Sequence, residues 1–252
     1  MTRFNYNLGD DGNTEFAKGI NSHLPSRRRG KATAVPAGTT FIVSNFPAFA
    51  HAAVVGTGAA SNADSPGGAF INSLTSAAAG DSSTVVTATV ATRRDWNPWI
   101  RFNFCAGNNI ASVRWWIGAF ASDPSALSTI SSISGACFGY DTQVDGTAFW
   151  RCETGNASTA TKKTTTIPVV ANTSYTAEIR MDTANAKIDF YMASHGLLTA
   201  VKTQMPLTLV ASLASSVPVA ATPLLLGATT TVLNTAAAAK RIVMGSVEIS
   251  QD

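Results

Sequence analysis

The stretch SYTAEIRMDTANAKIDFYM, residues 174–192, decides the fold class of this chain. In its first half the apolar side chains recur at every second position: Tyr175, Ala177, Ile179 and Met181. The second half repeats the pattern with Ile188, Phe190 and Met192. Alternation with a period of two places one set of side chains on the buried face of a β-sheet. The short polar connection at 183–185 predicts an antiparallel hairpin.

Strand-like patterns of apolar and β-branched residues continue over most of the chain beyond residue 38. Further strands are expected at 39–45, 83–92, 99–104, 112–120, 136–142, 147–153, 207–213, 223–228 and 240–250. In 112–120 both alternating sets carry large side chains, with Trp115 and Ile117 in one and Arg114, Trp116 and Phe120 in the other, so this strand is predicted to be central and covered on both faces. Many short strands separated by turns are typical of a two-sheet sandwich or a barrel. A helical turn is expected only within 231–240 or 124–132.

Three cysteines, Cys105, Cys137 and Cys152, are too few and odd in number for a disulfide framework. We expect buried, reduced thiols. Asp145-Gly146 is a strong hairpin signal between two β-rich runs and brings Cys137 close to Cys152. A shift of one residue in the register would place these two thiols on opposite faces of the sheet.

The chain divides into an extended N-terminal arm, residues 1–38, and a β-sandwich domain, residues 39–252. The arm lacks strand alternation and carries a short basic run. That run is predicted to be an assembly contact with an acidic neighbour: Arg27, Arg28, Arg29 and Lys31. A solvated arm is the second interpretation. Nucleic-acid binding is the least favoured, because no aromatic residues are interleaved for stacking on bases.

Composition indicates a surface that is short of charge. Charged residues make up 13% of the 252 residues, whereas soluble domains average about 25%. Ala, Ser, Thr and Gly replace Lys and Glu, and such a surface suits burial against neighbouring copies. We therefore expect a homo-oligomer, a trimer being the leading form. No apolar run reaches the ~20 residues of a membrane span, and the polar first residues predict no secretory signal.

Few sequence motifs typical of catalytic or metal-binding sites are present. The histidines are isolated in sequence: His23, His51 and His195. No nucleophile elbow is present, and Glu153 and Glu178 are not set in a paired-carboxylate pattern. Calcium takes six to eight oxygens, of which Asp141, Thr142 and Asp145 could supply a few from one loop, so a calcium site is a less favoured alternative. The sequence predicts a protein that is not an enzyme and holds no cofactor and no metal.

Five tryptophans stand out: Trp96, Trp99, Trp115, Trp116 and Trp150. Aromatic side chains of this size usually serve as core or intersubunit anchors. An exposed ring could instead stack on a sugar. Trp96, Trp99 and Trp150 are the candidates for such an aromatic binding surface.

A series of motifs across residues 112–250 resembles a known family. The order is Trp116-x-Gly118-x-Phe120, Asp123-Pro124, CFGYDT at 137–142, Trp150-x-Cys152, Tyr175, IDFY at 188–191 and Met205-Pro206-Leu207. It is similar to the concanavalin-A-like, or laminin-G-like, β-sandwich modules of bacteriophage structural proteins of the head-decoration, tail-fibre and tail-tip types. The resemblance implies two curved antiparallel sheets of jelly-roll type. It carries over no sugar site, because the dense acidic cluster of the lectins is missing.

These features together predict an all-β, antiparallel two-sheet sandwich that serves as a non-enzymatic virion structural protein. The expected role is a capsid decoration, or cement, protein or a spike component that contacts itself and other virion proteins. The alternative is a tail-fibre or tail-tip protein that binds a receptor or a host-surface glycan. Membrane association is not expected.

Overall fold

The computed structural model describes residues 40–44, 49–55, 59–65, 68–75, 78–87, 92–144, 148–197, 206–234 and 239–251. Residues 40–74 are described by their backbone. The predicted N-terminal arm lies outside the described residues, and so do its basic residues Arg27, Arg28, Arg29 and Lys31.

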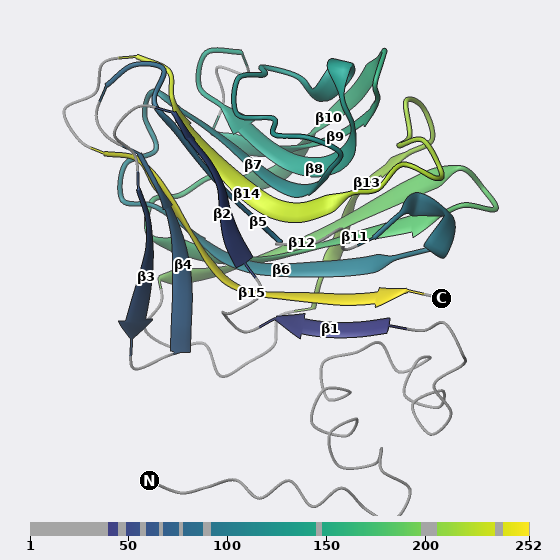
Figure 1. The fold of residues 1–252 in the computed structure, drawn as a ribbon, viewed down its shortest axis with the longest axis horizontal. Helices are drawn as coiled ribbons and strands as arrows, with labels where there is room; N and C mark the ends of the chain where they lie inside the picture. Colours follow the sequence, from purple (N-terminus) through teal and green to yellow (C-terminus); the bar gives the residue numbers. More distant parts are fainter. Residues whose placement is uncertain are drawn as a thin grey trace, which may run out of the picture.

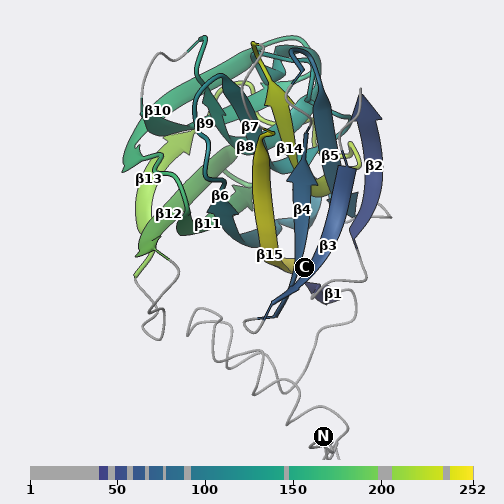
Figure 2. The same ribbon diagram turned by 90° about the vertical axis from the view of Figure 1, so that its left-hand side faces the viewer.

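The described strands form two antiparallel sheets stacked as separate layers (Figures 1 and 2). The eight-stranded sheet has the order β13 (Thr208–Leu213), β12 (Lys187–Leu197), β11 (Thr173–Asp182), β6 (Trp99–Ala106), β15 (Arg241–Gln251), β4 (Gly68–Leu74) and β3 (Ala59–Ser65), with β1 (Thr40–Ser44) also paired to β15. The seven-stranded sheet has the order β10 (Ala160–Pro168), β9 (Phe149–Asn156), β8 (Ser134–Asp141), β7 (Val113–Phe120), β14 (Leu225–Val232), β5 (Ser82–Thr87) and β2 (Phe49–Val55). The predicted all-β, two-sheet sandwich is confirmed.

The core between the sheets contains the alternating side chains that decided the fold class. Tyr175, Ala177, Ile179 and Met181 of β11 are buried there with Ile188, Phe190 and Met192 of β12. At one end of this core Trp150 contacts Phe104 and Tyr175 edge-on, with ring centroids 5.4 and 5.5 Å apart. Because buried apolar area contributes roughly 25 cal/mol per Å², these large rings contribute strongly to the stability of the sandwich.

Strand β7 is covered on both faces, as its two apolar sets predicted. Trp115 points into the core between the sheets. Trp116 and Phe120 lie on the opposite face and form a second, smaller core with Ile130 and Cys137. The cover over this face is the connection between β7 and β8, residues 121–133, here called the strap. It includes the short 3₁₀ helix η2 (Ile130–Ser132), within the range where a helical turn was expected.

The register of the β8–β9 hairpin separates the two cysteines. Phe138 pairs with Cys152, and Cys137 pairs with Glu153. The thiol of Cys152 therefore lies in the core between the sheets, whereas that of Cys137 lies under the strap. The two thiols were expected to approach each other across the hairpin. The observed register is instead the one that places them on opposite faces of the sheet, and all three cysteines are free. The Asp145-Gly146 turn lies outside the described residues.

Candidate functional site

The outer face of the seven-stranded sheet is the first region where side chains of functional type gather. Trp116 lies flat against Gly139 of β8, where a Cβ atom would come within 2.5 Å of the indole ring. The guanidinium of Arg151 lies over the same ring, 4.6 Å from its centroid. The indole N–H donates to the carbonyl of Leu127 at 3.1 Å, and Arg151 Nη2 donates to that of Ser128 at 2.7 Å. Both side chains therefore fix the strap to the sheet.

Glu153 is the second anchor of the strap. Its side chain is fully buried, and Oε1 accepts the backbone N–H of Ile130 at 2.7 Å and the hydroxyl of Thr129. Oε2 lies 3.2 Å from Arg151 Nε and forms an ion pair with it. This carboxylate is engaged by internal partners and is not open to a substrate.

The beginning of the strap is fixed through Asp123. Its Oδ1 accepts from the hydroxyl of Thr84 on β5 and from the backbone N–H of Ser125, both at 2.9 Å. Thr231 of β14 donates to the carbonyl of Ser125 at 2.8 Å. The strap is thus bonded to β5, β7, β9 and β14, and it closes this face across the middle of the sheet.

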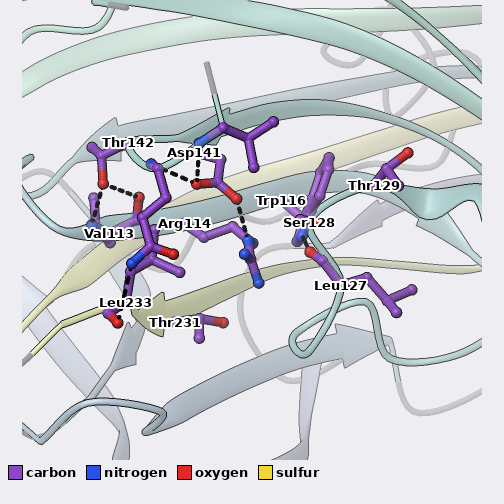
Figure 3. A network of polar contacts seen from close by, with 12 residues as sticks. Val113, Arg114, Trp116, Leu127, Ser128, Thr129, Asp141, Thr142, Thr231 and Leu233 are labelled. Atoms are coloured by element: carbon purple, nitrogen blue, oxygen red, sulfur yellow. Dashed lines mark hydrogen bonds and ion pairs between the residues drawn. The ribbon is translucent and has the colours of Figure 1, made fainter. Parts of the chain in front are cut away.

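Beside the strap lies a buried ion pair, shown with its neighbours in Figure 3. Arg114 Nε is 2.5 Å from Asp141 Oδ2, and the other carboxylate oxygen accepts from the backbone N–H groups of Gln143 and Val144. Asp141 therefore forms the start of the β8–β9 turn. Within the described residues no group of three or more His, Cys, Asp or Glu side chains is placed to hold a metal ion.

The outer face of the eight-stranded sheet carries a row of paired charges. Arg101 Nη2 lies 3.0 Å from the buried carboxylate of Glu178, which also accepts from Arg180. The guanidinium of Arg101 covers the ring of Trp99, 4.7 Å from its centroid. Trp99 is 2% exposed, so its indole lies beneath this network.

Two of the three tryptophans proposed as an aromatic binding surface are therefore not available. Trp150 is 0% exposed because it fills the core between the sheets, and Trp99 is buried on the outer face. Contrary to the prediction, neither ring offers a face to a ligand. Trp96 alone of the three is partly exposed.

Trp96 lies in a compact loop at one end of the sandwich, in the 3₁₀ helix η1 (Arg94–Trp96). Arg93 stands over its ring, 5.3 Å from the centroid, and forms an ion pair with Asp95. Arg94 Nε donates to the carbonyl of Pro218 at 2.6 Å. The loop thus brings two guanidinium groups, one carboxylate and a partly exposed indole into four consecutive positions.

Comparison with known proteins supports the fold. The sequence matches no protein-family model and no curated protein. A protein of unknown function from Shewanella oneidensis MR-1 aligns over 90% of this chain and 94% of its own, with a TM-score of 0.58 and 14% identity. Arcelin-5, a lectin-like defence protein from Phaseolus vulgaris, aligns over 85% and 98%, with a TM-score of 0.52 and 8% identity.

The catalytic domain of a GH131 β-glucanase from Podospora anserina aligns over 73% of this chain and 72% of its own, with a TM-score of 0.50 and 12% identity. The chain has a concanavalin-A-like fold. At these identities the likeness concerns the fold alone. Since the fold is shared by a lectin-like protein and a glucanase, it does not assign an activity.

Sequence reasoning named Trp96 but not its neighbours in the η1 loop, and it missed the strap. The strap carries no periodic pattern, and its bonds reach residues up to about a hundred positions away, as in Thr231 to Ser125. The η1 loop had one visible signal, the run Arg93-Arg94-Asp95-Trp96, in which two cations, an anion and an aromatic residue are adjacent.

Proposed function

We propose that this chain is a non-enzymatic structural protein of a virion, a capsid decoration or spike component that holds neighbouring subunits. The observation that carries the proposal is the distribution of charge. Residues 1–38 contain six Lys or Arg and three Asp or Glu, whereas residues 39–252 contain twelve of each. The whole formal net charge of +3 therefore belongs to the first 38 residues.

A neutral sandwich with little charge favours contact between copies. Like-charge repulsion, which keeps most soluble proteins apart, is weak for such a body. Five large apolar side chains are exposed among the described residues: Phe149 (39%) and Val170 (46%), where β9 begins and β10 ends, and Val144 (46%), Leu209 (51%) and Val219 (49%). These side chains support lateral packing against a neighbour.

The basic segment suits contact with an acidic partner and not with another copy of the sandwich. Four positive charges within five positions, 27–31, attract an acidic partner over about one Debye length, roughly 8–10 Å in physiological salt. A module of this design attaches through its N-terminal segment and packs against its copies through the sandwich. The resemblance of residues 112–250 to phage structural modules supports a virion as the setting.

The environment of the carboxylates supports a role without catalysis. Hydrolysis of glycosides on two carboxylates requires both groups to reach the substrate. Glu153, Glu178 and Asp141 each have 0% side-chain exposure and an arginine partner. In the part of the chain that the structure describes, these groups act as internal anchors.

The proposal is tested by quantifying the chain in purified particles by mass spectrometry and locating it by electron microscopy. A decoration protein is expected in many copies that follow the symmetry of the shell. Removal of residues 1–31 is expected to abolish incorporation while the sandwich keeps its circular dichroism spectrum. Normal incorporation of the shortened chain would contradict the role given to the basic segment.

The second candidate is a tail-fibre or tail-tip protein that binds a receptor or a host-surface glycan. The partly exposed Trp96 with Arg93 beside it favours this alternative. A few copies confined to the tail of the particle would decide for it and against a decoration protein.

A further inference from the structure

We propose that residues 4–11 of one copy, here called the donor segment, add as an antiparallel strand to the edge strand β10 of a neighbouring copy. The inference rests on the proposed function, since it names a contact through which the copies assemble. The donor segment has the sequence FNYNLGDD and lies outside the described residues, whereas the accepting strand lies within them.

The accepting edge is the last strand of the seven-stranded sheet, and β10 lies at the margin of the sandwich in both views (Figures 1 and 2). Where the β9–β10 hairpin turns, the backbone N–H of Asn156 donates to the carbonyl of Thr159 at 3.1 Å. Hydrogen-bonded and non-hydrogen-bonded pairs alternate along an antiparallel ladder. Every second residue from Ala160 to Thr164 therefore turns its backbone N–H and C=O groups away from β9. An extended segment can bond to groups of this kind by strand addition.

The side chains along this edge divide into a charged part and an apolar part. Lys162 and Lys163 are exposed near the start of β10, and as consecutive residues of a strand they point to opposite faces. At the other end Pro168 pairs with Phe149, which is 39% exposed, and Val170 follows with 46% exposure. A matching strand would carry acidic side chains on both of its faces and apolar side chains a few positions away.

The donor segment has these two parts. Residues 1–38 as a whole lack strand alternation, but apolar side chains recur at every second position near their start: Phe4, Tyr6 and Leu8. The consecutive acids Asp10 and Asp11 follow, and in a strand they would point to opposite faces. The apolar part precedes the acids in the donor segment, whereas it follows the lysines on β10. Only an antiparallel arrangement therefore matches both parts at once.

The charges also select the donor segment over a second β10 strand. In the antiparallel arrangement Asp10 lies opposite Lys163, and Asp11 lies opposite Lys162. Opposite charges across two strands stabilise a sheet, and like charges directly opposite each other destabilise it. A two-fold pairing of β10 with itself through its outward-facing residues would set two Lys162 side chains opposite each other. Lysines on an edge strand discourage such self-pairing, and an acidic strand removes the repulsion.

The position of β1 assigns the donor segment to a neighbouring copy. The chain that follows the segment leads to β1, which lies at the opposite end of the molecule from β10 in both views (Figures 1 and 2). Residues 12–39 can span up to roughly 90–100 Å when fully extended, which is enough to reach the next copy. Because the donor segment and the accepting edge are different surfaces, the contact is heterologous. A closed ring such as a trimer satisfies every copy through contacts of this type.

The first test reverses the charges in the full chain. One variant combines Lys162→Glu with Lys163→Glu, and another combines Asp10→Lys with Asp11→Lys. Each is expected to raise the dissociation constant of the oligomer about tenfold or more in sedimentation equilibrium, because like charges then face each other. A chain with all four substitutions should associate within about threefold of the unmodified chain, because opposite charges face each other again.

The matched control combines Lys187→Glu with Arg241→Glu. These substitutions change the net charge as much as the reversal on β10 does, but at cations on the other sheet. The dissociation constant should stay within about twofold of that of the unmodified chain, since these positions are remote from the proposed contact. If the reversal on β10 unfolds the sandwich, the reversal in the donor segment still decides the question, because that segment lies outside the sandwich domain.

The second test detects the contact covalently. Asp10→Cys and Lys163→Cys are made in separate chains, which are mixed, left to exchange subunits and oxidised. Opposed residues of a non-hydrogen-bonded pair have Cα atoms about 4.5 Å apart, which a disulfide can bridge. Mass spectrometry of the proteolysed mixture is expected to find the peptides of positions 10 and 163 joined. Lys187→Cys in place of Lys163→Cys should give no such link.

Three outcomes would overturn the proposal. They are unchanged association of both charge-reversed chains, no recovery in the chain with all four substitutions, and a link between positions 10 and 163 that forms only when both cysteines are in one chain. A chain that is a monomer at every concentration would contradict both the assembly role and this contact. An oligomer that is insensitive to the charge reversals would contradict this contact alone, so the two failures are distinguishable.

Discussion

The stability of the strap depends on single residues, and Glu153 is the most heavily engaged of them. Replacing it by Gln keeps the shape of the side chain but leaves the Arg151 guanidinium buried without its counter-charge. Breaking a buried ion pair in this way costs about 3–5 kcal/mol. We expect Glu153→Gln to lower the free energy of unfolding by roughly that amount in urea denaturation.

Glu248→Gln is the matched control. The side chain of Glu248 is 16% exposed and lies 4.0 Å from Arg101, at the limit of an ion pair, so the loss of its charge is expected to cost less than that of Glu153. Equal losses of stability in the two variants would show that Glu153 has no special role as an anchor of the strap.

His195 provides a prediction about pH. Thr176 donates its one hydroxyl proton to Asn103 at 2.7 Å, so His195 Nε2, also 2.7 Å away, must be the donor to Thr176. Burial lowers the pKa of His195 from its usual 6.5. The unfolded chain then binds the proton more readily, and stability falls as the pH drops below about 6.5. His195→Gln should flatten this part of the pH–stability curve, and an unchanged slope would contradict the argument.

At the scale of elements, the β8–β9 register determines what the thiols can do. Burial raises the pKa of Cys137 and of Cys152 well above the usual value, and it raises that of the half-buried Cys105 as well. Since the thiolate is the reactive form, we expect Cys105 to react first with Ellman's reagent. The other two thiols should react only as the chain unfolds.

An oxidant should not join Cys137 to Cys152, because their side chains lie on opposite faces of the sheet. Mass spectrometry of the oxidised, proteolysed chain checks this. A peptide pair linked through these two residues would show that the register differs by one position.

The strap is a second element with a testable attachment. Asp123→Ala removes the acceptor of Thr84 and of both donors of Ser125. Hydrogen bonds to a charged group contribute about 1.5–3 kcal/mol each. Amide hydrogen exchange in 121–133 is therefore expected to accelerate roughly tenfold or more, while amides of β6 and β11 keep their protection. Unchanged exchange in the strap would mean that Asp123 does not hold it.

These elements also show where sequence reasoning succeeds. The alternation in β11 and β12 predicts the inward residues because one face of that sheet is fully buried and the side-chain period is two. The two apolar faces of β7 predict the cover that the strap supplies. The hydrogen bonds between the strap and β9 could not be predicted from the sequence, because a contact such as that of Glu153 with Ile130 follows no sequence period.

The tryptophans show what could not be predicted from the sequence, which is whether each ring is exposed. Composition identifies a large aromatic residue but not the face of the strand on which it lies after a bulge or a turn. Trp99 is buried because Arg101, two positions along the same strand, folds over its ring. Trp96 is partly exposed and lies in the short 3₁₀ helix that ends at Asn97. The contacts of Arg93 with the ring of Trp96 and with Asp95 become visible only with the loop in place.

At the scale of the whole molecule, a neutral sandwich follows a basic segment of 38 residues. The two parts should respond differently to salt. Attraction between the basic segment and an acidic partner is screened as ionic strength rises, whereas apolar contacts between sandwiches are not weakened by it. Attachment to a particle should thus be lost in high salt before the copies separate from one another.

We propose that the chain works as an assembled module, and its mass in solution tests this most directly. Sedimentation equilibrium of the full chain at physiological salt is expected to give a discrete homo-oligomer, with a trimer as the leading expectation, that persists on dilution. A mass of 26.2 kDa at all concentrations, with no tendency to associate, would contradict the account.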